Sequence, residues 1–453
     1  MKPMDYENGS ITKTILRLTL PMFVAQSLNL LYNIVDRVYI GRIPEIGTTA
    51  LGAVGLCFPV VILITAFTNL YGMGGSPLFA IERGRQNEKK AAELMNTSFW
   101  LEVVTGLILI VGIELFARPM MEAFGAGKAT IGYCLQYLRI YALGTVFSMI
   151  ATGMNPFINA QGFPSVGMTT VIIGAVLNIV LDPVFIFVFG MGIRGAAAAT
   201  VISQAVSALF VLRFLRSDRS LFPLSFTCTR AYIKDILMLG SSAFVMQITN
   251  SLVNIVCNNV LASTGGELYI SIMTIVSSVR QMLEVPILAI MEGTSPFISF
   301  NYGARHPQRI RSAMKIMFLI GFAYALIVTG LIERFPSFFI RIFSDDRAIE
   351  QAAVRCLHLY FYAFVFMVFQ YTGQTTFKAL NKRKKAIFFS LLRKAVIVIP
   401  LTIWLPTVVE PATDGVFMAE PISNIIGGLA CFITMLVTVL PELKRMEREN
   451  EHE

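Results

Sequence analysis

Three polar residues of this sequence, Asp36, Asn178 and Asp182, lie inside apolar segments that are long enough to cross a membrane. A charged side chain near the middle of a bilayer costs about 2.5–3.5 kcal/mol on insertion scales, so an acid retained there is a candidate for function. Asn178 and Asp182 are four residues apart, and a helix places both side chains on one face. Pro183 follows directly and loosens the preceding turn, because proline lacks an N–H.

These residues suit either of two chemistries. A carboxyl group removed from water takes up a proton near neutral pH more readily than one in solution. The same carboxylate, together with an amide, a hydroxyl and a carbonyl, offers the oxygen ligands that a hard cation prefers. Thr200 and the carbonyl of Ala196, one turn apart on the next apolar segment, could complete such a cation site. The residue types leave proton binding and cation binding open.

Each candidate also has a purely structural interpretation. Asp36 precedes Arg37 near one end of its apolar segment and could be a charge at the membrane surface. Asp182 has no basic neighbour in the sequence, which favours a functional role there. The small residues from Gly195 to Thr200 also permit two helices to approach closely, whether or not they bind anything.

The second half of the chain offers different ionisable residues. Cys257 takes the place that Asp36 has in the first half, so no equivalent acid is present there. Arg280 and Glu284 lie four residues apart and could neutralise each other as an ion pair. We expect Glu102 and Glu420 to be packed or to lie at the membrane interface.

A further set of residues could line a substrate cavity. Polarisable methionine and aromatic side chains suit flat lipophilic cations, and the chain has 22 Met and 35 Phe, most of which we expect to pack or to face lipid. Candidates for the cavity itself are Asn29, Asn33, Met291 and Glu292.

Composition determines which kind of protein must position these residues. Of 453 residues, 55% are hydrophobic and 14% are charged, with a mean hydropathy of +0.68. Because soluble domains carry about 25% charged residues, a cytosolic enzyme is excluded. The net charge of +9 is spread over loops without interleaved aromatics, which favours anionic lipid over nucleic acid as the partner. Neither the cysteines nor the histidines have metal-ligand spacing, and no phosphate-binding loop motif is present.

Apolar windows predict twelve membrane-spanning helices, and the loop charges predict their direction. If the N-terminus is cytoplasmic, segments on the inner side hold 26 of the 37 basic residues, including seven between Lys378 and Lys394, and the outer segments hold 9. Both termini are then inside. The helices are expected near residues 15–40, 51–79, 92–117, 133–155, 167–189, 195–215, 236–260, 271–300, 313–333, 357–377, 387–406 and 416–440.

Self-comparison divides the chain into two halves. Gly74, Ser76, Pro77 and Gly84 recur 219 residues later, Gly195, Ala199, Ile202 and Ser203 recur after 220, and Asn29 and Asn33 recur after 221. Six helices in each half make the repeat parallel, with a substrate cavity expected between the halves. The fold class is therefore an all-α polytopic membrane protein with two parallel six-helix repeats. We expect an N-lobe at 1–215, a cytoplasmic linker at 216–235, a C-lobe at 236–440 and a cytoplasmic tail at 441–453.

Several motifs, taken in order, resemble those of a known transporter family. Asp36 follows Pro21 by fifteen residues in VDRVYIGRIP, and the later motifs are ALGAVG (50–55), GMGGSP (72–77), NIVLDP (178–183), GAAAAT (195–200) and SPFISFNYGA (295–304). This order resembles the MATE (multidrug and toxic compound extrusion) transporters of the DinF-like and MepA-like bacterial branch. The resemblance covers almost the whole chain.

The resemblance implies an exporter that exchanges H⁺ or Na⁺ for organic, often cationic, compounds across a bacterial cell membrane. It implies a cation or proton site made of Asp36, Asn178, Asp182, Thr200 and the carbonyl of Ala196, with a bend of the first helix at Pro21. The second-lobe acids of the NorM-like branch have no match here. We expect a monomer without a catalytic site and without a cofactor other than the coupling ion.

Two other functions remain as alternatives. A flippase for lipid-linked precursors would need basic residues in its central cavity, for which Arg280 and Arg139 are the candidates. A membrane-embedded transferase would bind a divalent metal at outer acids such as Asp345 and Asp346, although these lie within a cluster of charged residues typical of a solvated loop.

Overall fold

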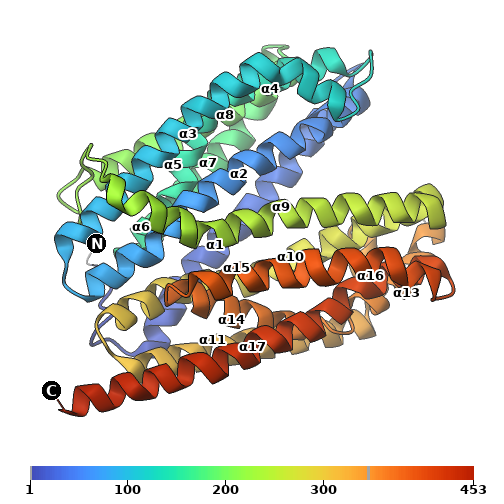
Figure 1. The fold of residues 1–453 in the computed structure, drawn as a ribbon. Coiled ribbons are helices and arrows are strands. Elements are labelled where there is room, and N and C mark those ends of the chain that lie inside the picture. The colour runs from blue at the N-terminus through green and yellow to red at the C-terminus, as the bar shows by residue number, and fades with distance from the viewer. Residues whose placement is uncertain (1–2, 344–346, 453) are drawn as a thin grey trace. The chain divides into compact units, whose positions relative to one another are not determined.

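The computed structural model describes residues 3–343 and 347–452, and within these ranges every regular element is a helix (Figure 1). The first half of the chain contains the helices α1 (Ile11–Gly41), α2 (Gly47–Gly84), α3 (Glu88–Ala123), α4 (Ile131–Leu143), α5 (Thr145–Gly153), α6 (Asn155–Ala160), α7 (Pro164–Pro183), the π-helix η1 (Val184–Val188), and α8 (Ile193–Leu215). After a segment containing the short η2 (Arg230–Tyr232), the second half contains α9 (Ile233–Thr264), α10 (Gly266–Gly303), α11 (Pro307–Arg334), α12 (Pro336–Arg341), α13 (Arg347–Phe361), α14 (Phe366–Ala379), α15 (Arg383–Leu391), the π-helix η3 (Leu392–Val398), α16 (Ile399–Trp404), η4 (Leu405–Thr407) and α17 (Ala412–His452).

The helices confirm the predicted membrane spans. Ten described helices are long and apolar enough to cross a membrane, and two bent pairs bring the number to twelve if each pair is one span. The bent pairs are α4 with the helices that follow it, at 53°, and α13 with α14, at 47°. Breaks of this kind do not show in an apolar window, because the side chains on both sides remain hydrophobic.

The repeat seen in the sequence extends to the lengths of the helices. α2 and α10 each have 38 residues and begin 219 residues apart. The same offset separates the starts of α3 and α11, of α7 and α15, and of α8 and α17. Both halves also have a π-helix in the fifth span, η1 in the first half and η3 in the second. The two halves therefore share one helical plan.

The chain forms two compact units, each with its own interior. The N-terminal unit comprises Met1–Asp5 and Val24–Phe244, and the C-terminal unit comprises Tyr6–Phe23 and Val245–Glu453. The division falls within α1 and within α9, so each unit contains part of both helices. The boundaries at 1–215, 216–235 and 236–440 stay a prediction.

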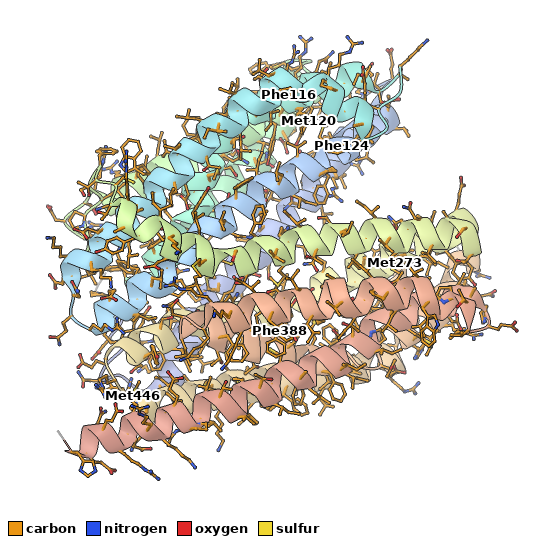
Figure 2. All side chains as sticks on the ribbon, in the orientation of Figure 1. Phe116, Met120, Phe124, Met273, Phe388 and Met446 are labelled. Atoms are coloured by element: carbon orange, nitrogen blue, oxygen red, sulfur yellow. The ribbon has the colours of Figure 1, made fainter. Side chains whose placement is uncertain are left out.

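Large hydrophobic side chains cover the outer faces of the helices. Phe116 on α3 and Phe388 on α15 are 58% and 56% exposed, and both project from the ribbon in Figure 2. A soluble protein rarely exposes apolar surface of this extent, whereas a bilayer solvates it. Most of the methionine and phenylalanine content thus belongs to packing and to the lipid-facing surface, as the sequence predicts.

Two segments differ from their expected environment. Arg393 and Lys394, which we assigned to a basic inner loop, are buried in η3, within the apolar span that runs from Arg383 to Thr407. The predicted tail continues α17 as far as His452, where Arg305 pairs with Glu449 at 2.6 Å. The assignment of Arg393 and Lys394 to a loop was wrong, because buried acids elsewhere in the fold neutralise them.

Candidate functional site

The C-terminal end of α7 and the start of α8 form the centre of the candidate site. α7 ends at Pro183, and the backbone continues as the π-helix η1 instead of an α-helix. Single turns of π-helix occur often at functional sites. α8 packs closely against η1 because Gly195 has no side chain, and a Cβ there would lie 2.7 Å from the backbone carbon of Phe185. This close approach places the first turns of α8 beside the end of α7.

A chain of hydrogen bonds connects the two helices. The Asn178 amide Nδ2 donates to Asp182 Oδ1 at 3.2 Å and to Thr200 Oγ1 at 3.3 Å. Thr200 Oγ1 donates in turn to the carbonyl of Ala196 at 3.0 Å. All four residues are buried, with exposed fractions of 0–8%. The structure thus brings together the four predicted residues of α7 and α8.

Asp36 reaches the same place from α1. Its carboxyl group lies within hydrogen-bonding range of the Asp182 carboxyl group, and the two interact electrostatically. Among the described residues, no donor reaches three buried oxygens of the group, Asp36 Oδ1, Asn178 Oδ1 and Asp182 Oδ2. We refer to Asp36, Asn178, Asp182, Ala196 and Thr200 as the Asp36 site. Two carboxylates this close repel each other unless a proton or a cation comes between them.

Three tyrosines lie near enough to the Asp36 carboxyl group to interact with it electrostatically, and sequence reasoning missed them. Tyr32, Tyr137 and Tyr141 all interact electrostatically with Asp36. Tyr137 and Tyr141 stack on α4 with ring centroids 5.7 Å apart, and Gln204 of α8 hydrogen-bonds Tyr141. The spacing was a usable signal, since Tyr32 lies one turn before Asp36 and the α4 tyrosines are also one turn apart. Only the packing of the helices shows that Tyr32 of α1 and the two tyrosines of α4 lie near the same carboxyl group.

The ligand set suits a proton or a small hard cation. Carboxylate, amide, hydroxyl and carbonyl oxygens can all coordinate Na⁺, and the three oxygens without a donor have free lone pairs for it. A single proton shared by the two carboxyl groups would also remove their repulsion. In the part of the chain that the structure describes, no three His, Cys, Asp or Glu residues group as they would around a metal ion.

The other predicted residues of α1 lie apart from this site. Pro21 is buried within α1, which is assigned as one continuous helix from Ile11 to Gly41. Asn29 and Asn33 are exposed on α1, and Asn33 Nδ2 donates to the carbonyl of Asn29 at 2.6 Å. Bending at Pro21 and substrate contact at the two asparagines stay predictions.

The two candidates on α10 are less open than expected. Met291 is 1% exposed, and Thr372 of α14 hydrogen-bonds its sulfur at 3.9 Å. Glu292 is half-buried and interacts electrostatically with Lys378 of α14. Met291 therefore packs in the interior of the C-terminal unit, and the acid beside it has a basic neighbour.

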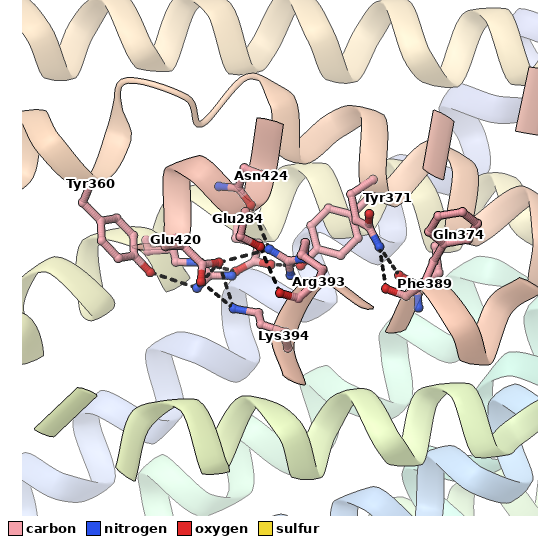
Figure 3. Close-up of polar contacts among 12 residues, drawn as sticks. Glu284, Tyr360, Tyr371, Gln374, Phe389, Arg393, Lys394, Glu420 and Asn424 are labelled. Carbon is pink, nitrogen blue, oxygen red and sulfur yellow. Dashed lines mark hydrogen bonds and ion pairs between the residues drawn. The ribbon is translucent and has the colours of Figure 1, made fainter. Parts of the chain in front are cut away.

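The C-terminal unit contains a second buried polar centre, shown in Figure 3. Glu420 on α17 accepts hydrogen bonds from Arg393 Nη1 at 3.0 Å and from Lys394 Nζ at 2.8 Å. Arg280 Nη1 of α10 lies 3.1 Å from the same carboxylate oxygen. We refer to Arg280, Glu284, Arg393, Lys394 and Glu420 as the Glu420 cluster. Glu420 is thus ion-paired and packed inside the unit. This is one of the two environments that the sequence led us to expect, the other being the membrane interface.

The rest of the Glu420 cluster is equally well paired. Arg280 Nε lies 3.4 Å from Glu284, which is the ion pair expected from their spacing. Arg280 also donates to the Tyr360 hydroxyl at 2.9 Å, and Tyr371 donates to Glu284. The Asn424 side chain accepts from Arg393 at 2.8 Å. Sequence reasoning missed Arg393 and Lys394 because neighbouring Lys382–Lys385 suggested a solvated loop.

The basic residues that a flippase would need are engaged elsewhere. Arg280 is held by two glutamates and a tyrosine, and Arg139 lies 3.8 Å from Glu114 on the exposed surface of the N-terminal unit. Asp345 and Asp346, the acids considered for a transferase, lie outside the described residues.

In the part of the chain that the structure describes, ten apolar helices with two bent pairs, a two-fold helical plan and two adjacent acids indicate a multi-pass membrane transporter. The sequence profile of the MatE family matches residues 21–184 and matches again at 242–404. The chain therefore belongs to the MatE (MATE) family, which confirms the resemblance seen in its motifs. The double match also agrees with the internal repeat.

Curated relatives and solved structures agree with this assignment. The chain is 28% identical over 351 residues to "Multidrug export protein MepA" of Staphylococcus haemolyticus, with 76% of each sequence covered. It is 26% identical to the protein of that name in Staphylococcus saprophyticus, with 87% of each covered. The fold matches "Outward-facing conformation of a multidrug resistance MATE family transporter of the MOP superfamily" with a TM-score of 0.91, 23% identity and 99% of both chains covered. It also matches "Crystal structure of MATE in the bent conformation" with a TM-score of 0.90, 24% identity and 97% of both covered.

Proposed function

We propose that this protein is a secondary active exporter that exchanges H⁺ or Na⁺ for organic, often cationic and lipophilic, compounds by alternating access. The export of organic compounds is supported by the name of the staphylococcal relatives, multidrug export protein. The proposal of ion coupling rests on one observation, the adjacent carboxyl groups of Asp36 and Asp182, each with one buried oxygen that no donor among the described residues reaches.

The coupling ion binds between the two acids. With the site empty, the Asp36 and Asp182 carboxylates repel each other in a medium that screens charge poorly. A proton or Na⁺ removes this repulsion and draws α1 toward the end of α7. Asn178 and Thr200 orient the Asp182 carboxylate through their hydrogen bonds, and Ala196 supplies a carbonyl oxygen.

α1 carries the effect of ion binding to the substrate. This helix contributes residues to both units, with Asp36 in the N-terminal unit and Pro21 in the C-terminal unit. A shift of α1 at Asp36 therefore changes the position of its exposed residues Asn29 and Asn33 relative to a bound compound. One charge crossing 100 mV supplies about 2.3 kcal/mol, which is enough to concentrate a substrate severalfold.

The test is transport in proteoliposomes loaded with a fluorescent cationic dye. A pH gradient and a Na⁺ gradient are imposed separately, each without the other, so that the coupling ion is identified by the gradient that drives dye movement. Asp36→Asn and Asp182→Asn should each abolish gradient-driven transport, because an amide neither binds a proton nor balances a cation's charge.

The control variant is Glu114→Gln, which removes an acid from α3 of the same unit, where it faces Arg139 on the surface. It should transport as the wild type does. The proposal fails if correctly inserted Asp36→Asn and Asp182→Asn proteins still show dye transport that follows either gradient.

We further propose that the protein works as a monomer in a bacterial cell membrane with both termini in the cytoplasm. The excess of basic residues in the inner segments supports this orientation. A single cysteine introduced in the tail of a variant without accessible thiols should be labelled by a membrane-impermeant maleimide only after the cells are opened.

A further inference from the structure

Glu102 lies in the middle of α3 and has no role in the Asp36 site. It is fully buried, and no donor among the described residues reaches either of its carboxyl oxygens. Each of the other fully buried acids has at least one polar partner, as Asp182 has in Asn178. Glu102 is thus the most isolated carboxyl group that the structure describes in the N-terminal unit.

Glycine on a neighbouring helix makes the room for this side chain. A Cβ at Gly153, the last residue of α5, would overlap the Glu102 carboxyl group. Gly153 stands at the break between α5 and α6, in the bent span that begins with α4. In Figure 1, α2, α3 and α5 all belong to the same helical group. Glu102 itself is 0% exposed.

The surroundings offer no charge that would balance an ionised Glu102. From α2, Tyr71 interacts electrostatically with it, and the Tyr71 hydroxyl is hydrogen-bonded to Thr105 at 2.7 Å. α5 has no ionisable side chain. From α4, Arg139 faces Glu114 instead, which is about three turns farther along α3. Among the described residues, no hydrogen-bond donor reaches the Glu102 carboxyl oxygens and no basic side chain forms an ion pair with them.

We propose that Glu102 is a proton-binding site of the N-terminal unit, separate from the Asp36 site, and that in this conformation it holds its proton and is closed to water. An ionised carboxylate without donors in an apolar interior is so costly that the group holds a proton instead. The proton is released to water, as Glu–COOH and H₂O give Glu–COO⁻ and H₃O⁺, so release requires that the contact with Gly153 opens and admits a water molecule. Gly153 is the last residue before the interruption between α5 and α6, so we expect the helix to move away there.

Infrared spectroscopy of the purified protein tests this directly, because a protonated carboxyl group has a C=O stretching band that an ionised one lacks. The background is the Asp36→Asn, Asp182→Asn double variant, which removes the two acids of the Asp36 site. At neutral pH this background should keep a protonated carboxyl band that moves only slowly on exchange into D₂O, because the site must first open to water. Adding Glu102→Gln should remove the band.

Glu102→Asp is the second variant. The shorter acid should shift the carboxyl band without removing it, so this test does not depend on whether Glu102→Gln folds well. A spectrum that neither variant changes would overturn the proposal and show that Glu102 is ionised or lies silent. Because the background lacks Asp36 and Asp182, the result is independent of whether those residues couple transport.

Discussion

The Asp36 site and the Glu420 cluster occupy corresponding places in the two repeats and differ in what balances their acids. At an offset of 220–221 residues, Asp36 corresponds to Cys257, Asp182 to Thr402 and Thr200 to Glu420. The contact between Asp36 and Asp182 has a counterpart in the second repeat, where Cys257 Sγ lies 3.9 Å from Thr402 Oγ1. The helical plan therefore brings the same positions together twice, with different chemistry.

The difference lies in the source of the positive charge. In the Asp36 site, two acids meet without an ion pair to a basic side chain in the described structure, although Arg37 interacts electrostatically with Asp36. Under the proposed function, a mobile proton or cation balances them. In the Glu420 cluster, Arg280, Arg393 and Lys394 are covalently attached cations that already surround the acid. A fixed cation cannot be released, and this asymmetry suggests that one repeat exchanges ions while the other is locked.

Glu420→Gln should give the largest loss of stability. The substitution leaves three buried cations with only Glu284 to balance them, and removing one partner of a buried ion network costs about 3–5 kcal/mol. The measurement is the melting temperature of the purified protein in detergent. Thr200→Ala, the matched change in the other repeat, removes the hydrogen bonds to Asn178 and Ala196 and should cost only about 1–2 kcal/mol. Equal effects of the two variants would mean that the cluster is not a structural network.

Asp36→Asn should abolish stabilisation by the coupling ion. A ligand at 100 times its dissociation constant stabilises the folded state by about 2.7 kcal/mol, so the wild-type melting temperature should rise with Na⁺ or with acidification. The variant should show no such rise. Glu292→Gln, an acid of the C-terminal unit outside both centres, should keep the rise. A variant at Asp36 that still responds to the ion would place the binding site elsewhere.

Gly195→Ala and Gly415→Ala should destabilise the protein equally, by about 1–3 kcal/mol each. A Cβ at Gly195 would meet the backbone of Phe185 at 2.7 Å, and a Cβ at Gly415 would meet the backbone of Leu405 at 2.7 Å. Both glycines allow the close helix packing that the two repeats share, and neither takes part in the ionisable groups by which the repeats differ. Thermal unfolding of the two variants checks this, and a large difference between them would show that the two close approaches are not equivalent.

Cys257→Ala should have the smallest effect, at most about 1 kcal/mol, because a thiol is a weak hydrogen-bond donor. Dye transport should continue at the wild-type rate, in contrast with the loss expected for Asp36→Asn at the corresponding position. A Cys257→Ala protein that inserts correctly but no longer transports would contradict the view that the second repeat binds no coupling ion.

The sequence was sufficient for the features that depend on local pattern. Twelve apolar windows gave the spans, the recurring glycines gave the repeat, and the spacing of Asn178 and Asp182 gave one face of α7. The grouping of Asp36 with α7 and α8 came from the family resemblance, and the structure places these residues together. Hydrophobicity along a segment is a local property, so it can be read without knowing the neighbours.

Only the tertiary structure decided how the ionisable groups are paired. It placed Tyr137 and Tyr141 where they interact electrostatically with Asp36, and it buried Arg393 and Lys394 against Glu420. It also left the Glu102 carboxyl oxygens without a hydrogen-bond donor among the described residues. The same lysine is solvated in a loop or ion-paired in an interior according to which acid lies opposite it on another helix. That choice depends on packing between segments far apart in the chain, and charge in a low-dielectric interior makes its energetic consequence large.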